Sequence, residues 1–168
     1  DHTDTLLTIA EVAAAFAGFG ALATVFSRRS DASVGPQQFI RLSNIVGSAI
    51  FLVVAALLPV LIAAFAGAEP LTWQLASGLV LVLDWIYIVV AMRAARLVSA
   101  STTSDSPAER FLVYGLEALI QLLLAGGALG FLGELAPPIY LAFLVLALVQ
   151  IGIQFMVLVW RFSSHLRE

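Results

Sequence analysis

The sequence predicts an all-α polytopic membrane protein with five transmembrane helices in a single domain, residues 1–168. Of these residues, 61% are hydrophobic and only 11% are charged, whereas soluble domains are about 45–50% apolar and about 25% charged. The apolar residues form separate runs of about twenty or more, which is the length that crosses a bilayer. The arginines fall on one side of the predicted membrane, and no lysine is present.

Polar sequence bounds the first two predicted helices. The first covers about 5–26 and ends at a serine and two arginines, Ser27–Arg29. Pro36 suits the first turn of the second helix, about 37–66, because the N–H that proline lacks has no partner there. Pro59 lies inside this helix and predicts a kink, since it removes one backbone hydrogen bond.

The remaining three helices are separated by turn signals. The third covers about 71–98 and is followed by a polar linker, SASTTSDSPAE. Within this linker Ser106 is suited to N-cap the fourth helix, about 108–131, with proline at its first position. The segment GELAPP then turns the chain into the fifth helix, about 139–162.

The charge distribution predicts the orientation. With five spans, one side carries all the arginines, which are Arg28, Arg29, Arg41, Arg93, Arg96, Arg110, Arg161 and Arg167. The other side carries acidic residues, which are Asp1, Asp4, Glu69 and Glu134. The positive-inside rule then places the N-terminus outside and the C-terminus in the cytoplasm. An even number of spans would scatter the arginines.

A polar stripe runs along the fourth predicted helix. Its members are spaced by four, three and four residues, and they are Arg110, Tyr114, Glu117 and Gln121. At about 100° per residue they share one narrow face. A carboxylate that faces lipid on a spanning helix is energetically costly, so this stripe is predicted to face protein or water.

Each of the other helices carries a comparable stripe. These stripes comprise Asp4, Glu11, Ala15, Gly18 and Leu22 on the first; Gln37, Arg41, Asn44, Ser48 and Ala55 on the second; Ser77, Asp84, Tyr87 and Ala91 on the third; and Gln150, Gln154 and Arg161 on the fifth. The stripes predict a bundle, or an oligomer of bundles, with a polar interior.

The depths of the polar residues favour a route for protons or small cations. Glu11 falls in the outer half, Asp84 near the midplane and Glu117 in the inner half. Acidic groups at successive depths suit stepwise transfer of positive charge. The predicted pathway residues are Glu11, Asn44, Asp84, Glu117, Gln121, Gln150 and Gln154. Supporting charge or hydrogen bonds are predicted from Arg41, Tyr87, Arg110 and Tyr114.

Two other functions fit the same residues. Polar side chains in membrane helices also act as hydrogen-bonded contacts between helices, worth about 0.6 kcal/mol each. On that interpretation the protein is a non-transporting module that binds lipid or a partner protein. A proton-coupled exporter of small molecules is the third possibility.

Small residues predict close helix approach. They recur at spacings of four, and the candidates for packing are Ala13, Ala17, Gly18, Gly126 and Gly130. Packing within the chain and contact between copies explain this pattern equally well, and we expect a homo-oligomer. Trp73, Tyr140 and Trp160 lie near the ends of the apolar runs and are predicted as interfacial aromatics.

The sequence argues against several other classes. His2 and His165 lie near the chain ends, which disfavours a membrane-embedded haem or metal site. The absence of cysteine excludes thiolate chemistry, and the absence of lysine excludes a retinal Schiff base. No nucleotide-binding or serine-hydrolase motif and no basic nucleic-acid patch occurs. We therefore expect no enzyme activity, cofactor, metal or nucleic acid, and membrane lipid and a second copy as partners.

The first apolar segment, LLTIAEVAAAFAGFGALATVFSRR, resembles the first helix of small uncharacterised bacterial polytopic membrane proteins. The shared features are the acidic Glu11, a run of small residues and a basic end. This resemblance implies a multi-pass protein of the bacterial inner (plasma) membrane. The triplet Ala10–Val12 is also similar to small multidrug exporters, in which a first-helix glutamate exchanges protons for drug cations. Those exporters have four shorter helices, so the similarity is confined to Glu11.

Overall fold

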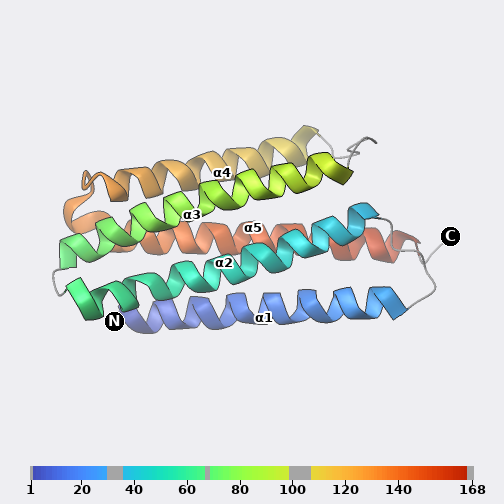
Figure 1. Ribbon diagram of the computed structural model, residues 1–168, viewed down its shortest axis with the longest axis horizontal. Coiled ribbons are helices and arrows are strands. Elements are labelled where there is room, and N and C mark those ends of the chain that lie inside the picture. The colour runs from blue at the N-terminus through green and yellow to red at the C-terminus, as the bar shows by residue number, and fades with distance from the viewer. Residues whose placement is uncertain (1, 30–35, 67–68, 99–106, 166–168) are drawn as a thin grey trace.

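The structure, a computed structural model, describes residues 2–29, 36–66, 69–98 and 107–165, which form an all-helical bundle (Figure 1). The elements are α1 (His2–Arg29), α2 (Pro36–Ala66), α3 (Glu69–Val98), α4 (Pro107–Ala128), the short 3₁₀ helix η1 (Gly133–Leu135) and α5 (Ala136–His165). Each predicted helix is present, and the described residues contain no strand.

The long helices run alternately up and down along one axis (Figure 1). As a result α1, α3 and α5 end, and α2 and α4 begin, at the same end of the bundle, which we call the arginine end. On these helices the sequence places within about two turns of that end Arg28, Arg29, Arg41, Arg93, Arg96, Arg110 and Arg161. The chain therefore has the alternating arrangement that the one-sided arginines predicted.

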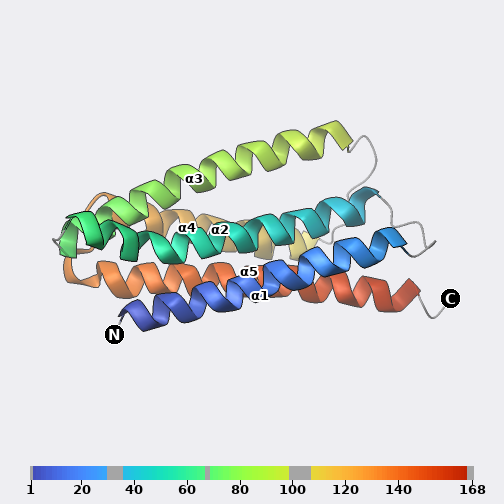
Figure 2. The same ribbon diagram turned by 60° about the horizontal axis from the view of Figure 1, so that its bottom comes forward.

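Helix α5 is the centre of the packing, because it contacts each of α1, α2, α3 and α4. Helix α1 packs mainly on α2, and α3 and α4 pack on one another. In Figure 2 the ribbon of α3 diverges from those of α2 and α5 toward the arginine end.

Four helical segments are long and apolar enough to cross a membrane, namely His2–Ala23, Leu42–Ala66, Pro70–Val90 and Gly133–Trp160. The described apolar part of α4, Tyr114–Ala128, is shorter. Large apolar side chains are exposed on the outside of the bundle, for example Phe19 at 64% and Val90 at 59%. An outer surface of this kind suits contact with lipid, so the fold is that of a multi-pass helical membrane protein.

A proline in α2 is compensated from α5. Pro59 lies inside α2 and has no N–H, so the carbonyl of Ala55 lacks its usual donor four residues further along the helix. The hydroxyl of Tyr140 on α5 donates a 2.7 Å hydrogen bond to this carbonyl. Tyr140 is only 2% exposed. The prediction that it is an interfacial aromatic is therefore wrong, because its hydroxyl has a specific partner in the core.

The turn between α4 and α5 differs from the predicted one. Helix α4 ends at Ala128, three residues before the predicted end, and Gly130 has a φ of 72°. This left-handed conformation favours glycine and stops the helix. Gly126 and Gly130 consequently do not share a helical face. The close approach on α4 instead involves Gly127, where a Cβ atom would lie 2.5 Å from the Ser77 hydroxyl on α3.

The small residues of α1 divide between the inside and the outside of the bundle. Ala13 is fully buried and Ala17 is half-buried. Gly20 is also buried, and a Cβ atom there would lie 2.6 Å from Val46 on α2. Gly18 is exposed, with no atom within 4 Å of a Cβ placed on it. Within one chain, the α1–α2 contact therefore depends on Ala13 and Gly20, and the face that carries Gly18 is left open.

Candidate functional site

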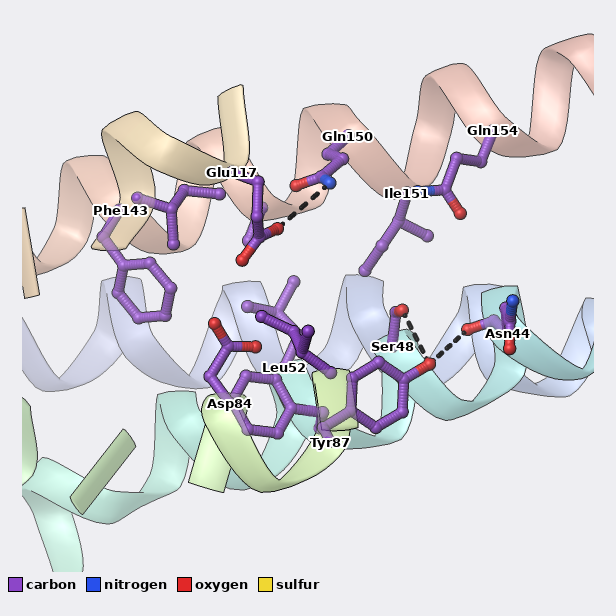
Figure 3. Close-up of a pocket in the computed structure, with 14 residues that line it drawn as sticks. Asn44, Ser48, Leu52, Asp84, Tyr87, Glu117, Phe143, Gln150, Ile151 and Gln154 are labelled. Carbon is purple, nitrogen blue, oxygen red and sulfur yellow. Dashed lines mark hydrogen bonds between the residues drawn. The ribbon is translucent and has the colours of Figure 1, made fainter. Parts of the chain in front are cut away.

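Two carboxylates and two amides from three helices meet inside the bundle. The Nε2 group of Gln121 on α4 donates hydrogen bonds to Oδ2 of Asp84 on α3 and, at 3.1 Å, to Oε1 of Glu117. The Nε2 group of Gln150 on α5 donates to Oε2 of Glu117 at 3.3 Å (Figure 3). We call these four residues the carboxylate cluster. The cluster links α3, α4 and α5 by hydrogen bonds between side chains.

Helix geometry explains why α4 contributes two members to the cluster. Glu117 and Gln121 are four residues apart, so both point to the same side of α4. That side faces α3, where Asp84 is only 8% exposed, and α5, where Gln150 is half-buried. The cluster is therefore shielded from the surroundings by the helices that build it.

The charges of the cluster are balanced only in part. The described partners of Asp84 and Glu117 are neutral amides, and one amide nitrogen serves both acids. Two nearby carboxylates repel one another when both are ionised, which favours a shared proton or a bound cation. In addition, the buried Oε1 atom of Gln121 has no hydrogen-bond partner among the residues that the structure describes. The arrangement is chemically suited to hold one positive charge.

A cavity of about 180 Å³ lies beside the cluster, between α2, α3, α4 and α5 (Figure 3). It is lined by Asn44, Ser48, Phe51, Leu52, Asp84, Tyr87, Ile88, Glu117, Ile120, Phe143, Ala147, Gln150, Ile151 and Gln154. A water molecule in the liquid occupies about 30 Å³, so the cavity has room for several. Its polar lining offers such water the partners that it needs.

Tyr87 connects the cluster with the polar residues nearer the arginine end. Its hydroxyl donates to the backbone carbonyl of Asn44 at 3.1 Å and lies 3.2 Å from the Ser48 hydroxyl (Figure 3). Gly47 makes room for the ring, since a Cβ atom there would lie 3.1 Å from the Tyr87 hydroxyl. The side chain of Asn44 is exposed, whereas Asp84 is buried. The polar lining therefore extends from the buried acids to the surface.

The predicted pathway and supporting residues separate into four groups in the structure. Asp84, Glu117, Gln121 and Gln150 form the cluster, and the cavity adds Asn44, Gln154 and the supporting Tyr87. In contrast, Glu11 is exposed on α1 and Tyr114 is 70% exposed on α4, and neither lines the cavity. The side chains of Arg41 and Arg110 lie outside those that the structure describes.

The apolar half of the lining was not predicted as part of the site. It consists of Phe51, Leu52, Ile88, Ile120, Phe143, Ala147 and Ile151. Helical spacing contains the signal that identifies several of these residues. Ile88 follows Asp84 by four positions, Ile120 follows Glu117 by three, and Ala147 precedes Gln150 by three. The positions one helical turn from the predicted polar residues therefore include several members of the apolar lining.

Comparisons with protein-family models, with curated proteins and with solved structures found no match for this chain. Helical bundles host many unrelated functions, so the fold alone does not assign one. The carboxylate cluster and its cavity are the features from which a function can be argued.

Proposed function

We propose that this protein is an integral membrane protein that passes protons or small cations through the polar core of its helical bundle. The observation that carries the proposal is the carboxylate cluster, in which Asp84 and Glu117 share the Gln121 amide between packed helices. Ionisable groups at depth in a membrane protein are costly, and they commonly mark ion or proton routes. The polar cavity beside the cluster supports a hydrated path to it.

The proposal includes five spans with the N-terminus outside and the C-terminus in the cytoplasm. Helix α4 has 22 residues, which at about 1.5 Å per residue gives about 33 Å, close to the roughly 30 Å of a bilayer core. Five spans keep every arginine of the sequence on the cytoplasmic side, as the positive-inside rule favours. The bacterial inner membrane is the compartment that we propose.

Flux measurements in liposomes test the function. Purified protein should conduct protons, sodium or potassium when no organic substrate is present, and the flux should carry charge. Glu117→Gln and Asp84→Asn keep size and hydrogen-bonding capacity while removing the charge. Both variants should fold normally and reduce the flux to the level of empty liposomes.

Glu134→Gln is the matched control, because Glu134 is an exposed acid in η1, away from the cluster. This variant removes the same charge and should leave the flux unchanged. Unchanged flux in both cluster variants, at unchanged thermal stability, would contradict the conduction route. That result would favour the non-transporting module. Flux that requires an organic substrate would favour the exporter.

We also propose self-association, through the open face of α1. Ala14, Ala15, Gly18 and Ala21 are exposed on α1, and small side chains allow a second helix to approach closely. Glu11 lies on the same helix and is exposed as well. A carboxylate in this position gains from a polar partner on another copy, because facing lipid is costly. A strictly monomeric protein in nanodiscs and in several mild detergents would refute this part.

A further inference from the structure

The cavity extends from the middle of the bundle toward the arginine end and does not reach the opposite end. On α2, which begins at that end, the lining residues run from Asn44 to Leu52 and include none further along. On α3, which runs toward that end, the lining starts at Asp84. On α5 it runs from Phe143 to Gln154. On α4 the lining is confined to Glu117 and Ile120. The lining therefore stops at the carboxylate cluster on α2, α3 and α4, and on α5 it continues about two turns beyond Gln150, to Phe143.

Closely packed side chains fill the interior on the other side of the cluster. Ala56, Ala76, Val80 and Leu124 are at most 1% exposed and come from α2, α3 and α4. Tyr140 of α5 lies among them, tied to the Ala55 carbonyl.

Aromatic rings extend this packing. The centroid of the Tyr140 ring lies 5.6 Å from the ring centroid of Trp73 and 5.4 Å from the ring centroid of Phe143. We call the segment formed by Trp73, Ala76, Val80, Leu124 and Tyr140 the packed block. Dense apolar packing of this kind leaves no continuous route for a hydrated ion.

We infer that the cavity is a one-ended vestibule, through which small monovalent cations reach the carboxylate cluster from the arginine end only. This inference deepens the proposed function and rests on it for the identity of the ligand. The part of the lining nearest the arginine end is polar, with Asn44, Ser48 and Gln154 available to replace part of an ion's hydration shell. At its floor, Asp84 and Glu117 supply a negative potential that selects cations over anions.

The same geometry distinguishes a carrier from an open channel. An ion bound at the cluster cannot proceed past the packed block without separating α5 from α2 and α3. Transport then requires a second conformation, in which the Tyr140 contacts open and the vestibule closes. Secondary transporters work in this way, by alternating access of one binding site to the two sides of the membrane.

Cysteine accessibility tests this inference, because the natural sequence contains no cysteine. Ser48→Cys places a thiol in the vestibule, and Ala76→Cys places one in the packed block. Each variant is treated with membrane-impermeant methanethiosulfonate reagents, one with a trimethylammonium group and one with a sulfonate group. Labelling is measured in intact cells and in inside-out vesicles, so that each membrane side is exposed separately.

We expect Ser48→Cys to react only in inside-out vesicles, and to favour the cationic over the anionic reagent about ten-fold more than a free thiol in solution does. Adding Glu117→Gln and Asp84→Asn should reduce this preference to that of the free thiol. Ala76→Cys should react from neither side. Leu83→Cys is the control for depth, because Leu83 is adjacent to Asp84 and 39% exposed on the outside of the bundle. It should face lipid and remain unlabelled.

Three results would overturn the inference: labelling of Ser48→Cys from the outside, equal rates with both reagents, or rapid labelling of Ala76→Cys. If Ala76→Cys does not fold, Val80→Cys replaces it, since Val80 belongs to the packed block, is 0% exposed and is larger than cysteine. The readout is chemical labelling and does not require flux. A protein that labels as expected but transports nothing would therefore disprove the proposed function and leave the vestibule established.

Discussion

Tyr140 on α5 supplies, through its hydroxyl, the hydrogen bond that the backbone carbonyl of Ala55 on α2 cannot obtain from its own helix. The missing donor is the N–H of residue 59, which is a proline. A buried carbonyl without a partner is costly, and more so in hydrocarbon than in water. The Tyr140 side chain therefore replaces a backbone hydrogen bond that is missing from α2, a helix far from it in the sequence.

Tyr140→Phe should reduce the free energy of unfolding by about 1–2 kcal/mol, because it leaves the Ala55 carbonyl unpaired without creating a cavity. Pro59→Ala restores the N–H of residue 59. In the Pro59→Ala background, the effect of Tyr140→Phe should fall to about 0.5 kcal/mol or less. Reversible unfolding in mixed micelles measures all four members of this cycle. Equal effects of Tyr140→Phe in both backgrounds would show that the hydroxyl does not compensate for the proline.

Gln121→Leu should destabilise the protein by about 1–3 kcal/mol, because Asp84 and Glu117 both lose an amide donor. Gln154→Leu is the matched control: it changes the same residue type in the same cavity, outside the carboxylate cluster. The control should change the stability less. If the two variants are equally stable, the shared amide is not an important contact.

Removing the acids should also remove most of the effect of Gln121→Leu. In a protein that carries Asp84→Asn and Glu117→Gln, no pair of carboxylates remains for the Gln121 amide to neutralise. The unfolding free energies of these variants, with and without Gln121→Leu, give the coupling directly. A coupling energy near zero would show that Gln121 contributes to stability through packing alone.

Gly20→Ala and Gly18→Ala should have opposite effects on stability. The added methyl group of Gly20→Ala lies 2.6 Å from Val46, so α1 and α2 must separate, at a cost of about 1–3 kcal/mol. Gly18→Ala meets nothing within 4 Å and should stabilise the helix by about 0.5–1 kcal/mol. Thermal unfolding compares the two variants.

Gly18→Leu tests the open face of α1, since it should weaken self-association and leave the folded monomer intact.

The orientation of the chain can be tested at residues 99–106. A thiol introduced by Ser101→Cys should react with an impermeant maleimide in inside-out vesicles and remain unlabelled in intact cells. The control is Thr5→Cys in the first turns of α1, which should show the reverse pattern. Labelling of Ser101→Cys from outside intact cells would exclude the five-span arrangement with an external N-terminus.

The helices were predictable from sequence because lipid imposes a simple rule on length and polarity. The direction of the stripe on α4 was also predictable, and Glu117 and Gln121 do face the interior. The sequence does not specify which helices are neighbours. The stripe on α1, which includes Glu11 and Gly18, is exposed in the structure, so the prediction that it faces the interior of one chain is wrong. A stripe marks one face of its helix and does not say which helix covers that face, so Glu11 could not be separated from Asp84 and Glu117.

Aromatic and small residues were the least predictable from pattern alone. Tyr140 lies near the end of an apolar run, where an interfacial and a buried tyrosine have the same sequence signature. Gly18 and Gly20 differ by only two positions, yet about 200° of helical rotation places them on different faces. In a segment composed almost entirely of small and apolar residues, no polar face indicates which glycine is turned inward.

The dependence of α2 on Tyr140 has a consequence for biogenesis. Helix α2 leaves the ribosome before α5, since it precedes α5 in the sequence. Before α5 is inserted, α2 lies in the bilayer or the insertion machinery without the Tyr140 hydrogen bond to its Ala55 carbonyl. The hydrogen bonding of α2 is thereby completed only when α5 has been synthesised and packed against it. A nascent protein truncated before residue 140 would contain every residue of α2 and still expose a polar defect that quality-control proteases can recognise.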